Sequence, residues 1–356
     1  MAGPDRLVLV GPYPPPWGGI SVHLRSLRAL AGRAAIEAEI LDVGEGHGAR
    51  TGADRIHDGG SRLRFLSGLA RTVRRGDAVH VHTSGNNAKA WLVALAASRP
   101  TVRADRRLLT VHSGLAPALL ERSSRVRALA RAAAQGYRRI LCTNAGIAAA
   151  LQACGIPRFQ LQVVSPFLPA DVEAKRAPPK ARAARERHDP LLACALAPGR
   201  QYGRAILLDA LAILAERTPG LGCLVFGSGT SGEELREAIE ARRLEGKVIA
   251  LGEIDHDEAL GAIGLSDLFV RPTLADGDSL SVREALGLGV RVVASDAAPR
   301  PRGVVTFPTG RSEALASVVE AALRREPPRS HTGAEGESSA LEAWGAIGLS
   351  TQGGKG

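Results

Sequence analysis

The sequence is poor in cysteine and contains no long apolar run. Four cysteines are spread over 356 residues without C-x-x-C spacing, which excludes a disulfide framework or a cysteine-based zinc motif. No stretch approaches the roughly 18 uncharged apolar residues of a membrane-spanning helix. The start, MAGPDRLVLVGPYPPP, has too short an apolar run and no cleavage-like site for a signal peptide. We therefore expect a cytoplasmic protein with reduced, buried thiols.

Aromatic residues make up only 3% of the chain, whereas basic residues are abundant and unevenly placed. Residues 1–170 hold 23 Lys and Arg against 10 Asp and Glu, and residues 171–356 hold 23 against 26. A basic half favours an anionic partner such as a phospholipid surface, a diphosphate-linked lipid or nucleic acid. The alternative is a solvated face in an arginine-rich protein. Because base-stacking platforms need aromatic residues, nucleic acid ranks last. The basic clusters are Arg62, Arg64, Arg71, Arg74 and Arg75, and Arg122, Arg125, Arg127, Arg131, Arg138 and Arg139.

Short apolar runs alternate with helical segments along both halves of the chain, which predicts α/β architecture with parallel doubly wound sheets. The runs predict strands at 7–10, 38–43, 78–82, 107–111, 140–143 and 162–164, then at 191–196, 222–226, 248–251, 268–270 and 290–294. The composition of residues 170–190 predicts a linker. We expect domains at 1–169 and 191–326, and a flexible tail at 327–356 with a possible short helix near 338–346.

The segment from Arg271 to Ser295 carries two acids, Asp276 and Glu284, on either side of a Gly-Asp-Ser turn. The turn predicts a helix beginning at about Ser279 to Ser281, whose free amides attract anions. The donor-binding amides would belong to Asp278, Ser279 and Leu280. Carboxylates so placed can accept hydrogen bonds from a polyhydroxyl ligand. The alternative is a capping box in which Glu284 bonds its own helix start.

This segment resembles the acidic signature of retaining glycosyltransferases of family 4, which have the two-domain GT-B fold. The resemblance rests on Asp276-x7-Glu284 followed by Ala285, Leu286, Gly289, Val292, Val293, Ala294 and Ser295. Asp replaces the family's first Glu, and Arg291 replaces its proline. The resemblance implies two Rossmann-like domains facing across a cleft, the second holding a nucleotide-diphosphate sugar and the first an acceptor. By the same resemblance Glu284 binds the ribose or diphosphate region and Asp276 binds sugar hydroxyls.

Two loops of the first half match the family's pattern. Gly18 and Gly19 follow the first strand, where the resemblance places them near the donor diphosphate; the alternative is a tight turn alone. Trp17 would stack on a ring on the acceptor side or simply cover the loop. The string LTVHSG ends in the family's strand-end histidine, so His112 is expected over the anomeric centre, with His82 on the acceptor side. The alternative is that each is a structural histidine. We expect no zinc site here, because no nearby Cys or carboxylate cluster completes a tetrahedral set.

The second half departs from the family at the diphosphate clamp. Where members carry G-R-x4-K-G, this chain has Ala197 and Tyr202 at the Arg and Lys positions. Arg200 or Arg204 could restore the charge, since guanidinium binds phosphate bidentately. Gly227 and Ser228 resemble the family's G-x-G loop near the base and ribose. No full G-x-G-x-x-G follows a strand, so no dinucleotide site is predicted. The acids of residues 252–258 are expected to cap a helix.

The sequence thus predicts a retaining, metal-independent glycosyltransferase of the hexosyltransferase type with no cofactor. It would move a sugar from a nucleotide-diphosphate sugar to a lipid-linked or surface-polysaccharide glycan, with peripheral contact at the anionic inner face of a membrane. The alternative, supported by the altered clamp, is a catalytically silent GT-B protein that binds a sugar nucleotide or regulates a partner. Neither reading assigns a protein nucleophile.

Overall fold

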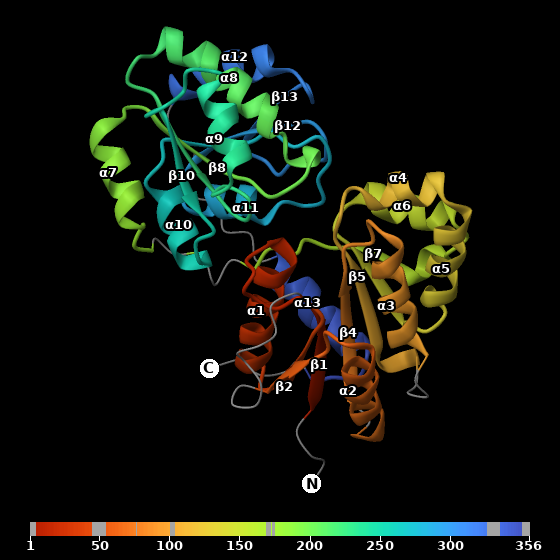
Figure 1. The fold of residues 1–356 in the computed structure, drawn as a ribbon. Coiled ribbons are helices and arrows are strands. Elements are labelled where there is room, and N and C mark those ends of the chain that lie inside the picture. Colours follow the sequence, from red (N-terminus) through yellow and green to blue (C-terminus); the bar gives the residue numbers. More distant parts are fainter. Residues whose placement is uncertain are drawn as a thin grey trace. The chain divides into compact units, whose positions relative to one another are not determined.

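The chain forms two compact units in a computed structural model that describes residues 5–44, 55–75, 77–99, 104–168, 172, 175–325 and 335–350. Unit 1 consists of residues 1–168 together with 334–356, and unit 2 consists of residues 169–333. Each unit has its own sheet and its own core (Figure 1).

Unit 1 is built on a seven-stranded parallel sheet in the order β3-β2-β1-β4-β5-β6-β7. Its inner strands are almost entirely buried, as expected for a sheet covered on both faces. The strands are β1 (Arg6–Gly11), β2 (Glu37–Asp42), β3 (Ile56–Asp58), β4 (Ala78–Thr83), β5 (Arg107–Val111), β6 (Arg139–Cys142) and β7 (Leu161–Val163).

Helices cover both faces of this sheet. One face packs against α2 to α6, and the other packs against α1 and the C-terminal helix α13 (Figure 1). The helices are α1 (Gly19–Arg33), α2 (Arg62–Arg75), α3 (Ala88–Ser98), α4 (Ala116–Arg122), α5 (Ser124–Ala134), α6 (Ala145–Ala153) and α13 (Glu335–Ala346).

Unit 2 has a six-stranded parallel sheet in the order β10-β9-β8-β11-β12-β13. Helices α8, α9 and α12 share a core with one face, and α7, α10 and α11 share a core with the other. The elements are α7 (Pro179–Arg187), β8 (Leu191–Ala195), α8 (Arg204–Arg217), β9 (Gly222–Phe226), α9 (Glu233–Glu240), β10 (Val248–Gly252), α10 (His256–Gly264), β11 (Leu268–Arg271), α11 (Leu280–Gly287), β12 (Arg291–Ser295), β13 (Val304–Phe307) and α12 (Ser312–Leu323).

Both sheets reverse their strand order at one point, between β1 and β4 in unit 1 and between β8 and β11 in unit 2. The prediction of two Rossmann-like, doubly wound parallel sheets is therefore confirmed. In such sheets ligands bind beyond the carboxyl ends of the strands at the reversal point. Among the described residues, no helix has the length and apolar character needed to cross a bilayer.

Part of the expected linker is a helix. Within residues 170–190, α7 places Ala181 and Ala184 in the same core as Leu191 and Leu224 of the sheet. Two small apolar residues three positions apart lie on one face of a helix and are enough to pack that face against the sheet. The surrounding Lys and Arg residues give the segment the composition of a linker. The rest of the expected linker, at 170–171 and 173–174, lies outside the described residues.

The C-terminal segment differs more strongly from the expected loose tail. Residues 335–346 form α13 (Figure 1). Its Trp344 is fully buried and belongs to the same core cluster of unit 1 as Leu7, Leu9 and Leu24. The Trp344 Nε1–H donates to Nδ1 of His80 at 3.2 Å. The helix was expected only as a short element, but a buried tryptophan supplies a large apolar area that fixes it in place. Residues 327–334 and 351–356 of the tail lie outside the described residues.

Candidate functional site

The loops after β8 and β11 are joined at the carboxyl edge of the unit 2 sheet. The backbone N–H of Leu274 donates to the carbonyl of Gln201 at 2.8 Å. Gly203 has a φ of 72°, and a Cβ at this position would lie 1.8 Å from the carbonyl oxygen of Pro272. A side chain is therefore excluded at residue 203. The close contact brings the altered clamp and the acidic segment to one edge, at the strand-order reversal where such sheets bind ligands.

Helix α11 begins at Leu280 with Ser279 as its N-cap residue, as the turn predicts. No side chain caps this end, and the Ser279 hydroxyl lies 3.2 Å from the Ser281 hydroxyl. Glu284 is the fifth residue of the helix rather than the third, so the capping-box alternative is wrong. Asp278 accepts from Nε of Arg283 at 2.7 and 2.9 Å. The first turn therefore keeps the amide-lined end that attracts anions.

Glu284 bonds a residue of another helix. Its Oε1 lies 2.8 Å from Nε2 of His256, the first residue of α10, and both side chains are about 9% exposed. Asp255 caps α10 by accepting from the backbone N–H of Glu258 at 2.8 Å, which confirms the capping interpretation for this acid. The contact between His256 and Glu284 spans 28 residues, so no local sequence pattern could reveal it. It fixes the direction of a buried carboxylate at the site edge.

Asp276 is the centre of a buried ion network. Its carboxylate accepts from Nε and Nη2 of Arg271 at 3.0 and 3.1 Å, and from Nη1 of Arg300 at 2.9 Å. The Thr273 hydroxyl and the Gly277 N–H add two more donors. Burial alone would raise the pKa of Asp276, but Arg271 and Arg300 hold this pKa well below its ordinary value. Since a carboxylate has about four acceptor positions, these five donors already occupy the group, and its expected contact with sugar hydroxyls stays a prediction.

Arginines lie near the altered clamp, but not at the two positions where the family pattern has Arg and Lys. The guanidinium of Arg271 lies over the ring of Tyr202, 5.6 Å from the ring centroid. Arg204 bonds Glu234 at 3.0 Å across an exposed surface. Arg200 is exposed at the start of a short 3-10 helix, and its guanidinium makes no hydrogen bond or ion pair with the described residues. Of the two expected substitutes, Arg200 has the free guanidinium and Arg204 is held in an exposed ion pair, and donor binding by either stays a prediction.

The G-x-G loop packs against the loop after β8. Gly227 has a φ of 114°, and a Cβ there would lie 2.2 Å from the carbonyl oxygen of Leu196. Packing alone therefore requires glycine at this position. Ser228 is half-buried beside it, and Thr230 closes the turn by donating from its hydroxyl to the Gly227 carbonyl at 2.8 Å. The expected contacts of Gly227 and Ser228 with a nucleotide stay predictions.

In unit 1, Gly18 and Gly19 lie at the beginning of α1, after the first strand. The Gly18 N–H donates to the Ser21 hydroxyl at 2.9 Å. A Cβ would meet nothing within 4 Å at Gly19 and only the Ser21 hydroxyl, at 4.0 Å, at Gly18. The fold itself therefore does not require glycine at either position, which leaves open space for a ligand. Trp17 lies beneath the guanidinium of Arg25, 5.4 Å from the ring centroid.

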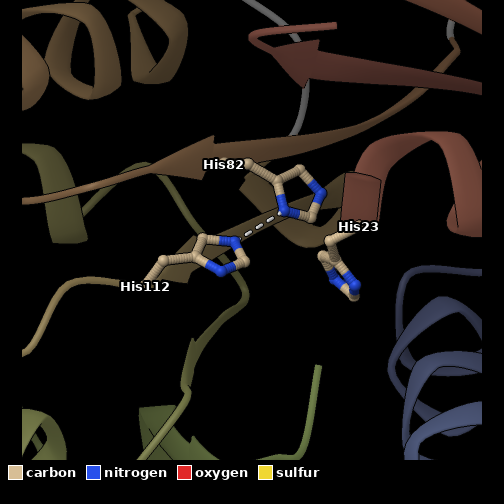
Figure 2. Close-up of side chains that lie close together, drawn as sticks. All are labelled: His23, His82 and His112. Atoms are coloured by element: carbon tan, nitrogen blue, oxygen red, sulfur yellow. Dashed lines mark hydrogen bonds between the residues drawn. The ribbon is translucent and has the colours of Figure 1, made fainter. Parts of the chain in front are cut away.

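Three histidines meet near the same edge of unit 1 (Figure 2). His82 comes from β4, His112 directly follows β5, and His23 comes from the second turn of α1. Nδ1 of His82 lies 3.1 Å from Nε2 of His112. The sequence predicted His82 and His112 but missed His23, whose helix packs its apolar face on the strands and carries the imidazole there.

His80 is different, because both of its ring nitrogens are satisfied. Nδ1 accepts from the Trp344 N–H, so Nε2 carries the proton and bonds the Thr110 hydroxyl at 2.7 Å. This tautomer assignment follows from the indole, which can only donate. His80 is therefore a structural histidine that ties β4 to β5 and α13.

Burial keeps all four imidazoles neutral near pH 7. It lowers the pKa of His23 to about 4 and that of His80 to about 3. It also lowers the pKa values of His82 and His112 well below the ordinary value, and the neighbouring histidines add to the effect. Neutral imidazoles keep a free nitrogen lone pair, which makes them acceptors, bases or metal ligands.

The sequence-predicted residues thus form two groups, one in each unit. In unit 2, Arg200, Gly227, Ser228, Asp276, Asp278, Ser279, Leu280 and Glu284 lie on loops or helix starts beyond the strands, whereas Arg204 is paired with Glu234. In unit 1, Gly18, Gly19 and Trp17 begin α1, while His82 and His112 lie at the ends of neighbouring strands.

Two family models match the chain, one for each half. Residues 17–172 match the model described as "Glycosyltransferase Family 4", and residues 185–338 match the one described as "Glycosyl transferases group 1". A stretch of 96 residues is 38% identical to the phosphatidyl-myo-inositol mannosyltransferase of Mycolicibacterium smegmatis. That stretch covers 26% of this chain and 24% of the relative.

Solved glycosyltransferase structures share the fold over nearly the whole chain. HepE of Anabaena, in complex with UDP and glucose, is 16% identical with a TM-score of 0.65, and 98% of each chain is covered. Sucrose-phosphate synthase of Thermosynechococcus elongatus is 15% identical with a TM-score of 0.66, covering 97% of this chain and 95% of that one. At such identities the likeness shows the fold alone. With both halves matched by glycosyltransferase family models, the chain belongs to glycosyltransferase family 4 and has the GT-B fold.

Proposed function

We propose that this protein is a retaining glycosyltransferase of the hexosyltransferase type that uses a nucleotide-diphosphate sugar. The observation that carries the proposal is Glu284, a buried carboxylate that His256 holds in place and that does not cap its own helix. Two relatives agree with this class, since one is named as a mannosyltransferase and HepE was solved with UDP-glucose. The donor sugar here is therefore expected to be carried on a nucleoside diphosphate.

Unit 2 supplies the donor site in this proposal. Glu284 accepts hydrogen bonds from the ribose or the diphosphate region while His256 fixes its other side. Arg200 and the amides of Asp278, Ser279 and Leu280 face the diphosphate as negative charge builds on it, and such preorganised donors usually make the largest contribution to catalysis. Gly227 and Ser228 lie near the base and ribose.

Asp276 then has a positioning role rather than a direct one. Its carboxylate holds Arg271 and Arg300 side by side despite their like charges. Arg271 lies over Tyr202, at the position where related proteins carry the clamp lysine. The network thereby keeps positive charge beside the altered clamp without the usual residues, and no metal ion on the diphosphate is invoked.

Unit 1 supplies the acceptor site. Gly18 and Gly19 leave room for a ligand at the start of α1, and Trp17 offers a ring face. His112 is half-buried and is assigned to the sugar-facing side, with His82 behind it. The sequence offers no protein nucleophile, and none is assigned.

The acceptor is proposed to be a lipid-linked or surface-polysaccharide glycan reached from an anionic membrane surface. The supporting feature is α2, which exposes Leu63 at 82% and Leu66 at 53%. Arg62 and Arg71 are exposed on the same helix, and Arg64 pairs with Asp58. An amphipathic helix with exposed leucines and arginines suits the interface of an anionic bilayer. The side chain of Arg74, expected in this cluster, lies outside the described part.

A second candidate is a catalytically silent GT-B protein that binds a sugar nucleotide or regulates a partner. Ala197 and Tyr202 in place of the clamp favour it. One experiment separates the two candidates: purified protein is incubated with UDP-, GDP- and ADP-sugars, and both thermal stabilisation and release of free nucleotide are measured. Stabilisation with release supports the enzyme, stabilisation alone supports the silent protein, and neither effect would refute both.

A further inference from the structure

The imidazoles of His23, His82 and His112 surround a common point. Each pair of ring centroids is 5.4 Å apart, so the rings form an equilateral triangle (Figure 2). The centre of such a triangle lies about 3.1 Å from each ring centroid, which is close enough for a small ion to reach a nitrogen of each ring after small side-chain rotations. One nitrogen from each ring lies within 4.8 Å of the other two. The close pair, at 3.1 Å, joins Nδ1 of His82 to Nε2 of His112, so these two nitrogens face each other.

Two nitrogens of this triangle are buried without a partner in the described part of the protein. They are Nδ1 of His23 and Nε2 of His82. A buried polar atom left unpaired costs free energy, so native proteins rarely keep one without a bound water or ion. His80, only 4.1 Å from His82 between ring centroids, shows that the same core can satisfy an imidazole completely. Of the three buried side-chain nitrogens without a partner among the described residues, two belong to the three-histidine cluster and the third is Nε of Arg106.

The ring of His23 has a backbone hydrogen-bond acceptor of the kind that orients histidines in metal sites. The Pro166 backbone accepts a hydrogen bond from the ring of His23, and since Nδ1 has no partner, the proton is assigned to Nε2. Metal-ligating histidines usually donate the other ring N–H to a carbonyl or carboxylate, which orients the ligating nitrogen. Burial keeps the rings neutral, as metal binding requires.

We propose that His23, His82 and His112 form a binding site for one divalent transition-metal ion of the zinc class. Three imidazoles without a carboxylate suit Zn²⁺, Co²⁺, Ni²⁺ or Cu²⁺ rather than Mg²⁺ or Ca²⁺, which prefer oxygen ligands. Three protein ligands leave a fourth position for water or a substrate oxygen. His112, the least buried of the three, lies on the side where that position would open.

All three ligands belong to unit 1, whereas the residues assigned to the donor diphosphate clamp belong to unit 2. The ion would join α1 to the ends of β4 and β5, and Nδ1 of His112 would remain on the opposite side of the ring from Nε2, available to the acceptor. The sequence-based expectation of no zinc site rested on the histidines near the ends of two strands, His80, His82 and His112, and did not include His23. In the structure His23 supplies the third ligand from a helix nearly 60 residues earlier in the sequence.

The competing explanation is a water molecule. A cavity of about 20 Å³ is lined by His23, His80, Thr110 and Ser165, which is room for about one water. Water there could satisfy Nδ1 of His23 without any ion. The test must therefore separate an ion from a solvent molecule.

The experiment uses the full chain, purified without a polyhistidine tag and stripped with chelator, and titrates it with Zn²⁺ and Co²⁺. We expect saturable binding of one ion per chain by calorimetry, a metal-dependent rise in Tm, and the intense visible absorption of tetrahedral Co²⁺. The variants His23→Gln, His82→Gln and His112→Gln should each weaken binding by more than about 100-fold. The matched control is His57→Gln, which removes a half-buried histidine bonded to Glu39 and should leave binding unchanged.

Circular dichroism of the stripped variants checks the fold, and His112→Gln, at the least buried ligand, keeps the test valid where a core variant does not fold. Absence of binding to the wild type, or binding that survives in a folded His112→Gln protein, overturns the proposal. So does loss of binding in His57→Gln alone. None of these readouts depends on glycosyl transfer, so failure here and failure of the proposed function can be told apart.

Discussion

Nε2 of His256 lies 2.8 Å from Oε1 of Glu284, and the two side chains join α10 to α11 in a buried setting. A carboxylate held in this way cannot turn freely, so its remaining acceptor positions point in a fixed direction. Such preorganisation is what a group that binds a nucleotide-sugar donor requires. This relationship is the structural basis for assigning Glu284 to the donor.

Arg200 is expected to contribute to donor binding, and Arg204 provides the matched control. Arg200→Ala should weaken nucleotide-sugar binding by more than about tenfold, consistent with roughly 1.5–3 kcal/mol for a hydrogen bond to a charged group. Arg204→Ala should change the affinity less, because Arg204 already pairs with Glu234. Calorimetric titration of both variants with the best donor measures the difference. Unchanged affinity in Arg200→Ala would show that the diphosphate is held elsewhere.

Asp276→Asn is expected to lower the free energy of unfolding of the protein as well as its glycosyl-transfer activity. The substitution removes the charge that pairs two arginines, and breaking a buried pair typically costs about 3–5 kcal/mol. The free energy of unfolding from urea titration at pH 7 gives the comparison, with Asp278→Asn as the control at a neighbouring carboxylate that pairs with Arg283. A loss for Asp276→Asn no greater than that of the control would contradict the ion-network account.

How far the sequence predicts this structure depends on the signal that each element carries. Arg107–Val111 and Gly222–Phe226 were predicted to the residue because short, mainly apolar runs between helical segments mark strands buried on both faces. β3 and β13 were missed, since three or four residues with mixed polarity carry too little periodicity. Helix α7 was hidden by its Pro, Ala, Lys and Arg composition.

In the candidate site, too, the sequence predicts the local features and misses the contacts between residues that are distant in sequence. The turn and the spacing of Asp276 and Glu284 are local, so the sequence located them and the start of α11. The partners of those acids are not local: His256 lies 28 residues before Glu284, and Arg300 lies 24 residues after Asp276. The meeting of His23 with His82 and His112 likewise depends on which strands become neighbours, and that is a property of the topology.

Stability is expected to fall as the pH drops below about 6.5, because of the buried histidines. The folded-state pKa values of His23 and His80 are lowered to about 4 and about 3 from an unfolded value of 6.5. Between these values the unfolded chain binds more protons than the folded one, so the free energy of unfolding decreases with falling pH. Each such group contributes a slope of up to about 1.4 kcal/mol per pH unit.

Urea unfolding at several pH values between 7 and 5, in the presence of chelator, measures this slope. His80→Gln should flatten it, since that variant removes one titrating group. A free energy of unfolding that does not change between pH 7 and pH 5 would show that the histidines are accessible to protons in the folded state.

The amphipathic face of α2 is expected to bind anionic membranes in a salt-dependent manner. Each basic residue near such a surface contributes about 1 kcal/mol, which decays within a Debye length. The double variant Leu63→Ser, Leu66→Ser should reduce flotation with anionic vesicles at low salt, and Arg62→Glu, Arg71→Glu should abolish it. Phe159→Ser, at an exposed apolar residue on another segment, is the control. Equal recovery with neutral and anionic vesicles, or none with either, would refute the membrane proposal.

The most direct test of the central claim is the stereochemical course of donor turnover in wild type and Glu284→Gln. The protein is incubated with the nucleotide sugar that raises its Tm most, and NMR follows both nucleotide release and the anomeric configuration of the first product. We predict turnover with net retention for the wild type. For Glu284→Gln we predict a folded protein slower by roughly 10²–10³-fold, comparable to the loss of one preorganised polar group in an active site. Wild-type turnover by folded Glu284→Gln, or inversion at the anomeric centre, would contradict the account.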